Sequence, residues 1–536
     1  MHRPATSSLE KALATCALAA TLALGAAACD DAAGTTSDDE AAEAVLPGKA
    51  DNYLSPTSQE YSLWGLGAES LDAADEALTH DEKEAKVREL LALRFKAYAH
   101  FINQYVADKD SHDSNRGYGG FAGLVRGSTL EFVVDPVDDA ELEWAFIWEL
   151  EMGGPADIMK RLPITTGADG DSTFLVQLPK LDAAALRSES YPESFDPTKY
   201  DAADLEELEV HITPEERSKD GWPLYAELAK DGVVDVLIEI GGDYNDARYD
   251  QQSAEKHFKW LVDAGFSHTA KAVSELTLES APFTKTIDMN GAKVEVRVQL
   301  LFPDIVPDAE LDRLRAAVIA GYETKDVVIY DGHAGLDPDY SGVVYHYNPR
   351  RAISATDLAK LDLPEKYQIF WFNGCKTYGA YPEAVYKAAN KDYANLDVVS
   401  TVNFSWLSQQ TFTTSGFLTE LLALDQKKHD PRTWTEILTR VNQRANYNVY
   451  YGVHGIDDNP HLNPYADPAS LCRTCSSNND CPGSGNLCVS LGKSGKRCAA
   501  ECTADDGCPG GYTCADIAVG GRITGHQCLP VGYSCP

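Results

Sequence analysis

The spacing of apolar positions changes along the chain and divides it into regions. Residues from about 59 to 105 are rich in helix formers, and Glu82 to Phe95 carries a helical apolar period. From Gly127 to about Ile212, short runs of β-branched and aromatic residues are separated by turn residues. The pattern predicts a helical segment plus a β-rich, β-sandwich-like domain over residues 51–225.

From about residue 232 the pattern alternates between strands and helices. Apolar strands are predicted at 235–240, 294–302, 327–330, 367–372 and 397–402, with helices at 253–264, 309–320 and 381–390. Such alternation predicts an α/β domain over residues 226–465, built on a mostly parallel sheet flanked by helices. Chemistry in sheets of this kind gathers at the carboxyl ends of the strands.

The last region, residues 470–536, has almost no apolar core and holds a repeated cysteine pattern. A Cys-x5-Cys-Pro motif starts at Cys475 and again at Cys502. Cross-links must supply the stability of such a small module. The ten cysteines expected to pair are Cys472, Cys475, Cys481, Cys488, Cys498, Cys502, Cys508, Cys514, Cys528 and Cys535. Their spacing leaves the connectivity and the role of the module open.

The first 28 residues have the character of an export signal, with an apolar stretch from Ala12 to Ala28. The small residues before Cys29 resemble the lipobox of bacterial lipoproteins, although Ala26 stands where that motif usually has Leu. The resemblance implies acylation of Cys29 and a place in the cell envelope, at the outer membrane or cell surface. The alternative is an ordinary secretory signal cleaved after Ala28. Residues 29–50 are acidic and predict a disordered tether.

Net charge limits the partners of the chain. At pH 7 the formal charge is −37, which excludes nucleic acid as an expected ligand because phosphate binding needs a basic surface. No apolar run after the signal is long enough for a bilayer span, so membrane contact is expected through the lipid anchor only. We expect no cofactor and no metal. The sequence does not determine the oligomeric state.

One cysteine stands apart from all the others. Of the 13 cysteines, Cys375 alone lies between the signal region and the C-terminal module. Cys375 and His333 each follow the end of an apolar strand, with a glycine beside them. If the two strands are neighbours, a spacing of about 5 Å brings sulfur and imidazole within reach of each other. An imidazole lowers the pKa of a thiol and later protonates the leaving group, so the pair suits nucleophilic catalysis. The alternative is a buried structural cysteine.

These residues resemble the clan CD cysteine peptidases, the group of caspases, legumains and gingipains. In that group one apolar strand ends in a His-Gly turn and a second ends in the nucleophilic Cys. Here the matching residues are His333 and Cys375, 42 positions apart, within a segment of roughly residues 232 to 455. The resemblance implies a caspase-like fold and an oxyanion hole from the turns at Gly332, Ala334 and Gly374. Ala334 departs from the family, which has Gly after the His.

Substrate contacts are implied by the same resemblance. Trp406 matches a Trp that lines the caspase substrate groove, and its alternative is a core Trp. Arg248 matches an Arg that anchors an acidic substrate side chain, and its alternative is an ion pair with the neighbouring Asp246 or Asp250.

We therefore expect an exported, lipid-anchored cysteine endopeptidase acting on peptides or proteins, with the β-rich region as a scaffold or a removable pro-region. The same Cys-His dyad also suits transpeptidation. Two other hypotheses are a non-enzymatic cell-surface binding lipoprotein and a caspase-fold pseudoenzyme that binds peptides without cleaving them.

Overall fold

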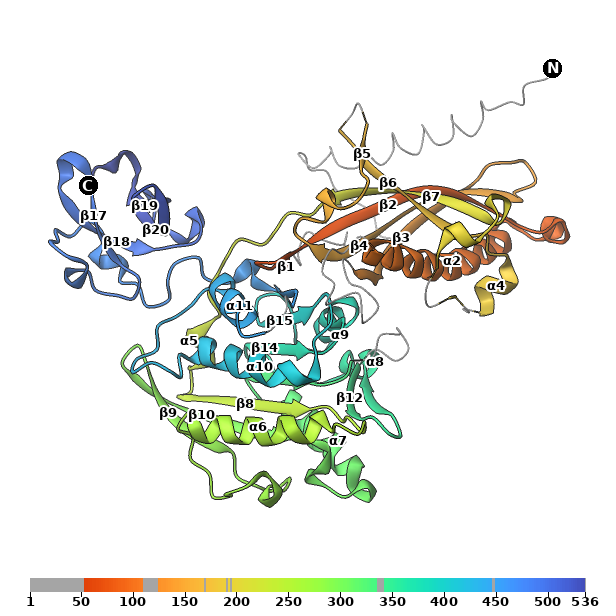
Figure 1. Cartoon of the computed structure of the whole chain (residues 1–536). Helices are drawn as coiled ribbons and strands as arrows, with labels where there is room; N and C mark the ends of the chain where they lie inside the picture. The colour runs from red at the N-terminus through yellow and green to blue at the C-terminus, as the bar shows by residue number, and fades with distance from the viewer. Residues whose placement is uncertain are drawn as a thin grey trace, which may run out of the picture.

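The computed structural model describes residues 53–108, 124–167, 170–188, 191–192, 195–334, 342–445 and 449–535. The predicted signal, Cys29 and the whole of the predicted tether lie outside these residues. Figure 1 shows three units: an N-terminal sheet with a long helix, a central α/β unit and a small C-terminal module. The predicted mixed α/β class with a disulfide-rich end is confirmed.

An eight-stranded sheet forms the central unit, in the order β1-β16-β15-β14-β11-β8-β10-β9. Its five inner strands run parallel: β8 (Val233–Ile240), β10 (Ala292–Leu301), β11 (Val327–Asp331), β14 (Gln368–Asn373) and β15 (Leu396–Thr401). The antiparallel strands are the two edge strands β9 (Phe283–Met289) and β1 (Tyr53–Leu54), and β16 (Tyr451–His454) between β1 and β15. Every residue of β11, β14 and β15 is buried, as expected for strands covered on both faces, whereas β10, next to the edge strand β9, alternates between buried and partly exposed residues.

Helices cover both faces of this sheet. On one face, α6 (Tyr249–Asp263), α10 (Leu407–Leu422) and α11 (Trp434–Asn442) contact one another. The other face carries α7 (Leu311–Tyr322), α8 (Ala355–Leu358) and α9 (Tyr381–Tyr386), where Arg315 pairs with Asp357 at 3.1 Å. A short hairpin of β12 (Gly342–His346) and β13 (Arg351–Ser354) follows β11, and α5 (Tyr225–Leu228) precedes β8.

The predicted β-sandwich is wrong, because the N-terminal unit has one sheet and a helix in place of a second sheet. The sheet has six strands in the order β3-β4-β2-β7-β6-β5, and α2 (His80–Asp108) lies along one face (Figure 1). Buried Val87, Leu91 and Phe95 of α2 complete the apolar layer that a second sheet would have supplied. The strands are β2 (Ser58–Ser70), β3 (Leu124–Pro136), β4 (Glu143–Pro155), β5 (Thr165–Thr166), β6 (Ser172–Pro179) and β7 (Leu205–Pro214), and α4 (Ala183–Ser188) lies between β6 and β7.

The predicted helix from residue 59 is also wrong over its first part, where β2 extends to Ser70. Tyr61 and Leu63 are buried on alternate positions of this strand, which fits a strand and not a helix. The helix starts only at His80, where a reciprocal cap forms: the Thr79 N–H donates to Glu82 Oε2 at 2.9 Å, and the Glu82 N–H donates to Thr79 Oγ1 at 3.4 Å.

Five disulfides hold the C-terminal module, so the predicted disulfide-rich module is confirmed. Within each repeat the first cysteine pairs with the third and the second with the fourth, and one further bridge joins the ends of the module. The pairs are Cys475–Cys488, Cys481–Cys498, Cys502–Cys514, Cys508–Cys528 and Cys472–Cys535. The strands are β17 (Leu487–Ser490), β18 (Lys496–Glu501), β19 (Tyr512–Val519) and β20 (Arg522–Pro530). This pattern favours an oxidising compartment.

Among the helices of the described residues, none combines the length and the apolar character needed to cross a bilayer.

Two buried carboxyl groups of the central unit make its stability depend on pH. Burial raises the pKa of Glu239 to about 8 and that of Asp397 to about 7. The folded state therefore holds protons that the unfolded state releases near pH 4, so the free energy of unfolding falls as pH rises from about 4 to 8. Each group contributes up to about 1.4 kcal/mol per pH unit within its own window.

We expect Glu239→Gln to remove part of this slope. Urea unfolding at pH 5, 6, 7 and 8 should show the variant gaining stability relative to the wild type as pH rises, because Gln carries no charge to desolvate. Asp397→Asn should also gain stability relative to the wild type as pH rises, but only up to about pH 7, the pKa of Asp397 in the folded protein. A stability difference that does not change with pH would contradict the prediction.

Candidate active site

The two predicted catalytic residues leave the same edge of the central sheet from adjacent strands. β11 and β14 pair in parallel, with Asp331 opposite Asn373. His333 and Cys375 each come two residues later, so the turns that carry them lie side by side. The structure thus meets the condition on which the predicted dyad depended, that the two strands are neighbours.

His333 is held by contacts on several sides. Its Nε2 lies 3.4 Å from Asp243 Oδ1, and its ring stacks on Tyr347 with centroids 4.8 Å apart. The Tyr330 hydroxyl donates to the carbonyl of His333 and so holds the backbone of the turn. The imidazole keeps 30% of its side-chain surface exposed.

Asp243 is a site residue that the sequence analysis did not assign. Its side chain is fully buried, and its Oδ1 accepts from the Asn245 amide at 2.6 Å while Oδ2 accepts from the Tyr249 N–H at 3.1 Å. A carboxylate fixed in this way orients the imidazole that it contacts. The available signal was its place just beyond β8, the strand next to β11.

Cys375, the only unpaired cysteine among the described residues, is partly buried. Its Sγ donates to the carbonyl of Ser405 at 3.7 Å, and in the described part of the chain no direct hydrogen bond joins it to His333. Burial raises the pKa of the Cys375 thiol, and the charge of neighbouring Lys376 offsets only part of this effect. The thiol is therefore neutral in this state, which differs from the expected thiolate and imidazole pair.

The turns at Gly332, Ala334 and Gly374 were expected to supply the backbone of an oxyanion hole. Within the described residues the Cys375 N–H donates to no acceptor. Ala334 is not among the described residues with positive φ, so its alanine side chain fits this backbone without strain.

The two turns touch at Gly374. A Cβ placed on Gly374 would lie 2.8 Å from Ala334 Cβ and 3.3 Å from the Gly332 carbonyl oxygen. Only glycine allows this approach, which brings the turn after β14 against the turn after β11.

A network of buried polar side chains connects the turn of His333 with the turn of Cys375. The Asn373 amide donates to Asp331 Oδ1 at 2.8 Å, and Asp331 Oδ2 lies 2.8 Å from His257 Nε2. The Gln410 amide donates both to the Gly332 carbonyl, at 3.1 Å, and to the Ser405 carbonyl that accepts the thiol, at 3.2 Å. The spacing of the two turns is thus set by side chains as well as by the strand pairing.

The two residues expected to contact substrate differ in their surroundings. Trp406 is partly exposed and is the residue just before the first turn of α10, next to Ser405. Arg248 makes a two-pronged ion pair with Asp250, both bonds 3.0 Å long, and contacts Asp304 at 2.5 Å. Its guanidinium is therefore neutralised, as in the ion-pair alternative for this residue.

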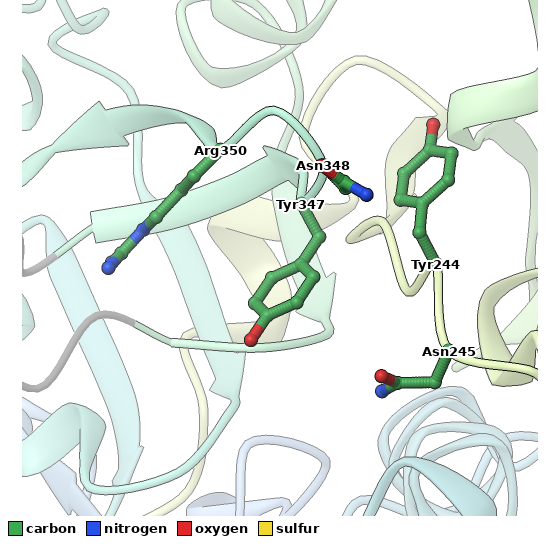
Figure 2. A pocket seen from close by; sticks show the side chains of 5 residues that line it. All are labelled: Tyr244, Asn245, Tyr347, Asn348 and Arg350. Atoms are coloured by element: carbon green, nitrogen blue, oxygen red, sulfur yellow. The ribbon is translucent and has the colours of Figure 1, made fainter.

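A recess of about 350 Å³ opens beside His333. Figure 2 shows Tyr244 and Asn245 on one side of it, and Tyr347, Asn348 and Arg350 on the other. Because Tyr347 also stacks on the imidazole, a side chain bound here would lie next to His333. This recess cannot be seen in the sequence, because its two sides come from segments about a hundred residues apart.

We expect Gly374→Ala to push the two turns apart, because its methyl group would overlap that of Ala334. The free energy of unfolding should fall by about 1–3 kcal/mol, and the rate at which Cys375 is alkylated should change. Adding Ala334→Gly should restore most of the stability, since it removes the opposing methyl group. Urea unfolding measures both. Gly374→Ala with wild-type stability would show that the turns are not in contact.

The raised pKa of Cys375 predicts slow alkylation at neutral pH. In the folded protein the iodoacetamide rate, followed by peptide mass spectrometry, should reach half its maximum at a higher pH than in the same protein unfolded in urea. A folded-state midpoint below that of the unfolded chain would mean that His333 already holds a thiolate.

Comparisons of this chain with protein-family models, with curated proteins and with solved structures found no match. The functional assignment of this sheet edge therefore rests on its residues and their geometry.

Proposed function

We propose that the chain is an exported, lipid-anchored cysteine endopeptidase whose central unit has a caspase-like fold. The observation that carries this proposal is the in-register pairing of β11 with β14, which places the turns of His333 and Cys375 at one sheet edge. Asp243, from the end of the next strand, contacts the imidazole and supplies the third polar member of the set.

In the proposed reaction, Cys375 Sγ attacks the carbonyl carbon of the scissile peptide bond. The thiol proton passes to His333 as the S–C bond forms, and the carbonyl oxygen takes up negative charge near the Cys375 N–H. His333 then gives the proton to the amine as the C–N bond breaks, which leaves a thioester. Water, activated by His333, hydrolyses the thioester, whereas an amine in place of water gives transpeptidation.

Because the thiol is neutral without substrate, binding of the peptide must bring it to the imidazole. A peptide that displaces the Cys375 hydrogen bond to the Ser405 carbonyl frees the thiol to reach His333. Asp243 holds Nε2 of the imidazole, which leaves Nδ1 to take the proton. Trp406 and the recess beside Tyr347 are the surfaces on which the peptide would lie.

The proposed location in the cell envelope is supported by the lipobox-like segment at Cys29 and by the disulfide-rich module. Acylation of Cys29 would anchor the protein in the cell envelope, and the acidic segment after it would hold the folded units away from the membrane. The five disulfides favour an oxidising compartment outside the cytoplasm.

A second candidate is a caspase-fold pseudoenzyme that binds peptides without cleaving them. The observation that favours it is the hydrogen bond of Cys375 to Ser405 together with the raised pKa of the thiol. A site arranged for catalysis in the absence of substrate would hold the thiol against the imidazole instead.

We expect the purified mature protein to cleave members of a peptide library. Cys375→Ala should abolish turnover, and His333→Ala should lower kcat by about 10²- to 10⁴-fold, the usual value of a positioned acid-base group. Asp243→Asn should lower kcat at least about tenfold through misorientation of the imidazole.

Asp246→Asn is the matched control, because this exposed carboxylate lies three residues from Asp243 in the same loop. It should leave turnover unchanged. Labelling of Cys375 by a peptide electrophile without any turnover would support the pseudoenzyme. A thiol that reacts only after unfolding would support a non-enzymatic surface lipoprotein.

A further inference from the structure

The turn that follows Cys375 is in contact with the N-terminal unit. This turn, η8 (Thr377–Gly379), carries Tyr378, which is fully buried. The Tyr378 hydroxyl donates to Glu60 Oε1 of β2 at 2.7 Å. The Arg126 guanidinium of β3 lies 5.3 Å from the centre of the same ring. A residue three positions after the proposed nucleophile is thus enclosed by another unit of the chain.

The contact belongs to a buried charge cluster. Arg126 pairs with Glu60 at 3.2 Å and with Glu151 of β4 at 2.9 Å. Each of these three residues has at most 8% of its surface exposed. Buried charges are tolerated only when they are paired and hydrogen-bonded. Tyr378 provides one of those bonds from the central unit, so the cluster is complete only when the two units are together.

Apolar contacts reinforce the same junction. Tyr53, Tyr378, Val402 and Tyr450 form one buried cluster. A Cβ on Gly153, near the end of β4, would lie 2.8 Å from Val402 and 3.0 Å from Tyr378, so the N-terminal sheet meets the turn without an intervening side chain.

The start of the N-terminal unit is also a strand of the central sheet. β1 pairs with β16 along the sheet edge, and β2 begins four residues after Leu54 (Figure 1). Ser55 Oγ donates to the Tyr451 carbonyl at 2.6 Å. A cut between β7 and α5 would therefore leave a fragment that still supplies one strand to the central sheet.

The opposite side of the Cys375 turn is bound by the central unit itself. The Lys376 N–H donates to the Asn403 carbonyl at 3.0 Å, and the Thr401 N–H donates to Thr377 Oγ1 at 2.9 Å. The turn is thus held between β15 on one side and the N-terminal sheet on the other.

We propose that the N-terminal unit is a permanent part of the catalytic domain, which positions Cys375 through the Glu60–Tyr378 contact, and is not a removable pro-region. Tyr378 and Glu60 are positioning residues, since they act on the thiol through the backbone of η8. The proposal concerns the reactivity of Cys375 and rests on the proposed function only in taking this thiol as the nucleophile.

The first test compares the reactivity of Cys375 toward a peptide electrophile in Tyr378→Phe, Glu60→Gln and the wild type, well below the unfolding midpoint of each. Both variants should lower the rate about three- to tenfold. The double variant should react no more slowly than the slower single variant, since both remove one contact. Ser62→Ala is the matched control: it breaks the 2.8 Å bond of Ser62 to Glu149 in the same sheet and should leave the rate unchanged.

The second test cuts the full chain at a site-specific protease sequence inserted after Glu216, which is exposed. The two fragments should stay together in gel filtration and keep a Cys375 reactivity within about twofold of the uncut protein.

Release of the N-terminal fragment with equal or greater thiol reactivity would overturn the proposal in favour of a pro-region. Wild-type rates in both point variants would overturn the positioning role. Because alkylation needs no peptide cleavage, absence of turnover would count against the proposed peptidase without affecting either result.

Discussion

The parallel pairing of β11 with β14 is the constraint on which the site depends. Two buried strands in fixed register deliver Asp331-Gly332-His333 and Asn373-Gly374-Cys375 to the same height at one sheet edge. A shift of one residue in a parallel ladder would move one turn by about 3.3 Å and turn its side chains to the opposite face. Burial of both strands on both faces makes such a shift costly, so the register fixes where the turns of His333 and Cys375 lie.

Side-chain hydrogen bonds further fix the two turns that the strand pairing brings together. Asn373 bonds to Asp331 directly beneath the turns, and Gln410 links the Gly332 carbonyl to the Ser405 carbonyl. Each of these polar groups is buried, and leaving one without a partner would cost about 1–3 kcal/mol. The network therefore favours a single arrangement of the two turns, in which the thiol meets the Ser405 carbonyl.

Contacts with the N-terminal unit also hold the turn that follows Cys375. Glu60 and Tyr378 are separated by 318 residues along the chain, yet their hydrogen bond completes a buried charge cluster beside the turn that follows Cys375. The sheet that supplies Glu60 uses its other face to bind α2. One unit thus has two distinct faces, one that packs on its own helix and one that meets the central unit through both charged and apolar contacts.

The sequence by itself determined the local features of this protein. Apolar strands ending in a glycine turn indicated where His333 and Cys375 lie, because strand period and turn chemistry are properties of a few adjacent residues. The even set of cysteines indicated the disulfide-rich module. Strand alternation after residue 232 indicated the α/β class, whereas the helix expected from residue 59 was a strand up to Ser70, since burial against α2 outweighed local propensity.

Only the tertiary structure decided which distant groups meet. Asp243 contacts His333 because β8 lies next to β11, and Ser405 accepts the thiol because β15, the strand that precedes it, lies next to β14. The pairing of the ten cysteines and the use of a helix in place of a second sheet also depend on contacts between remote segments. Burial set the charge state of Cys375, since it raises the pKa of the thiol and depends on the whole fold around it.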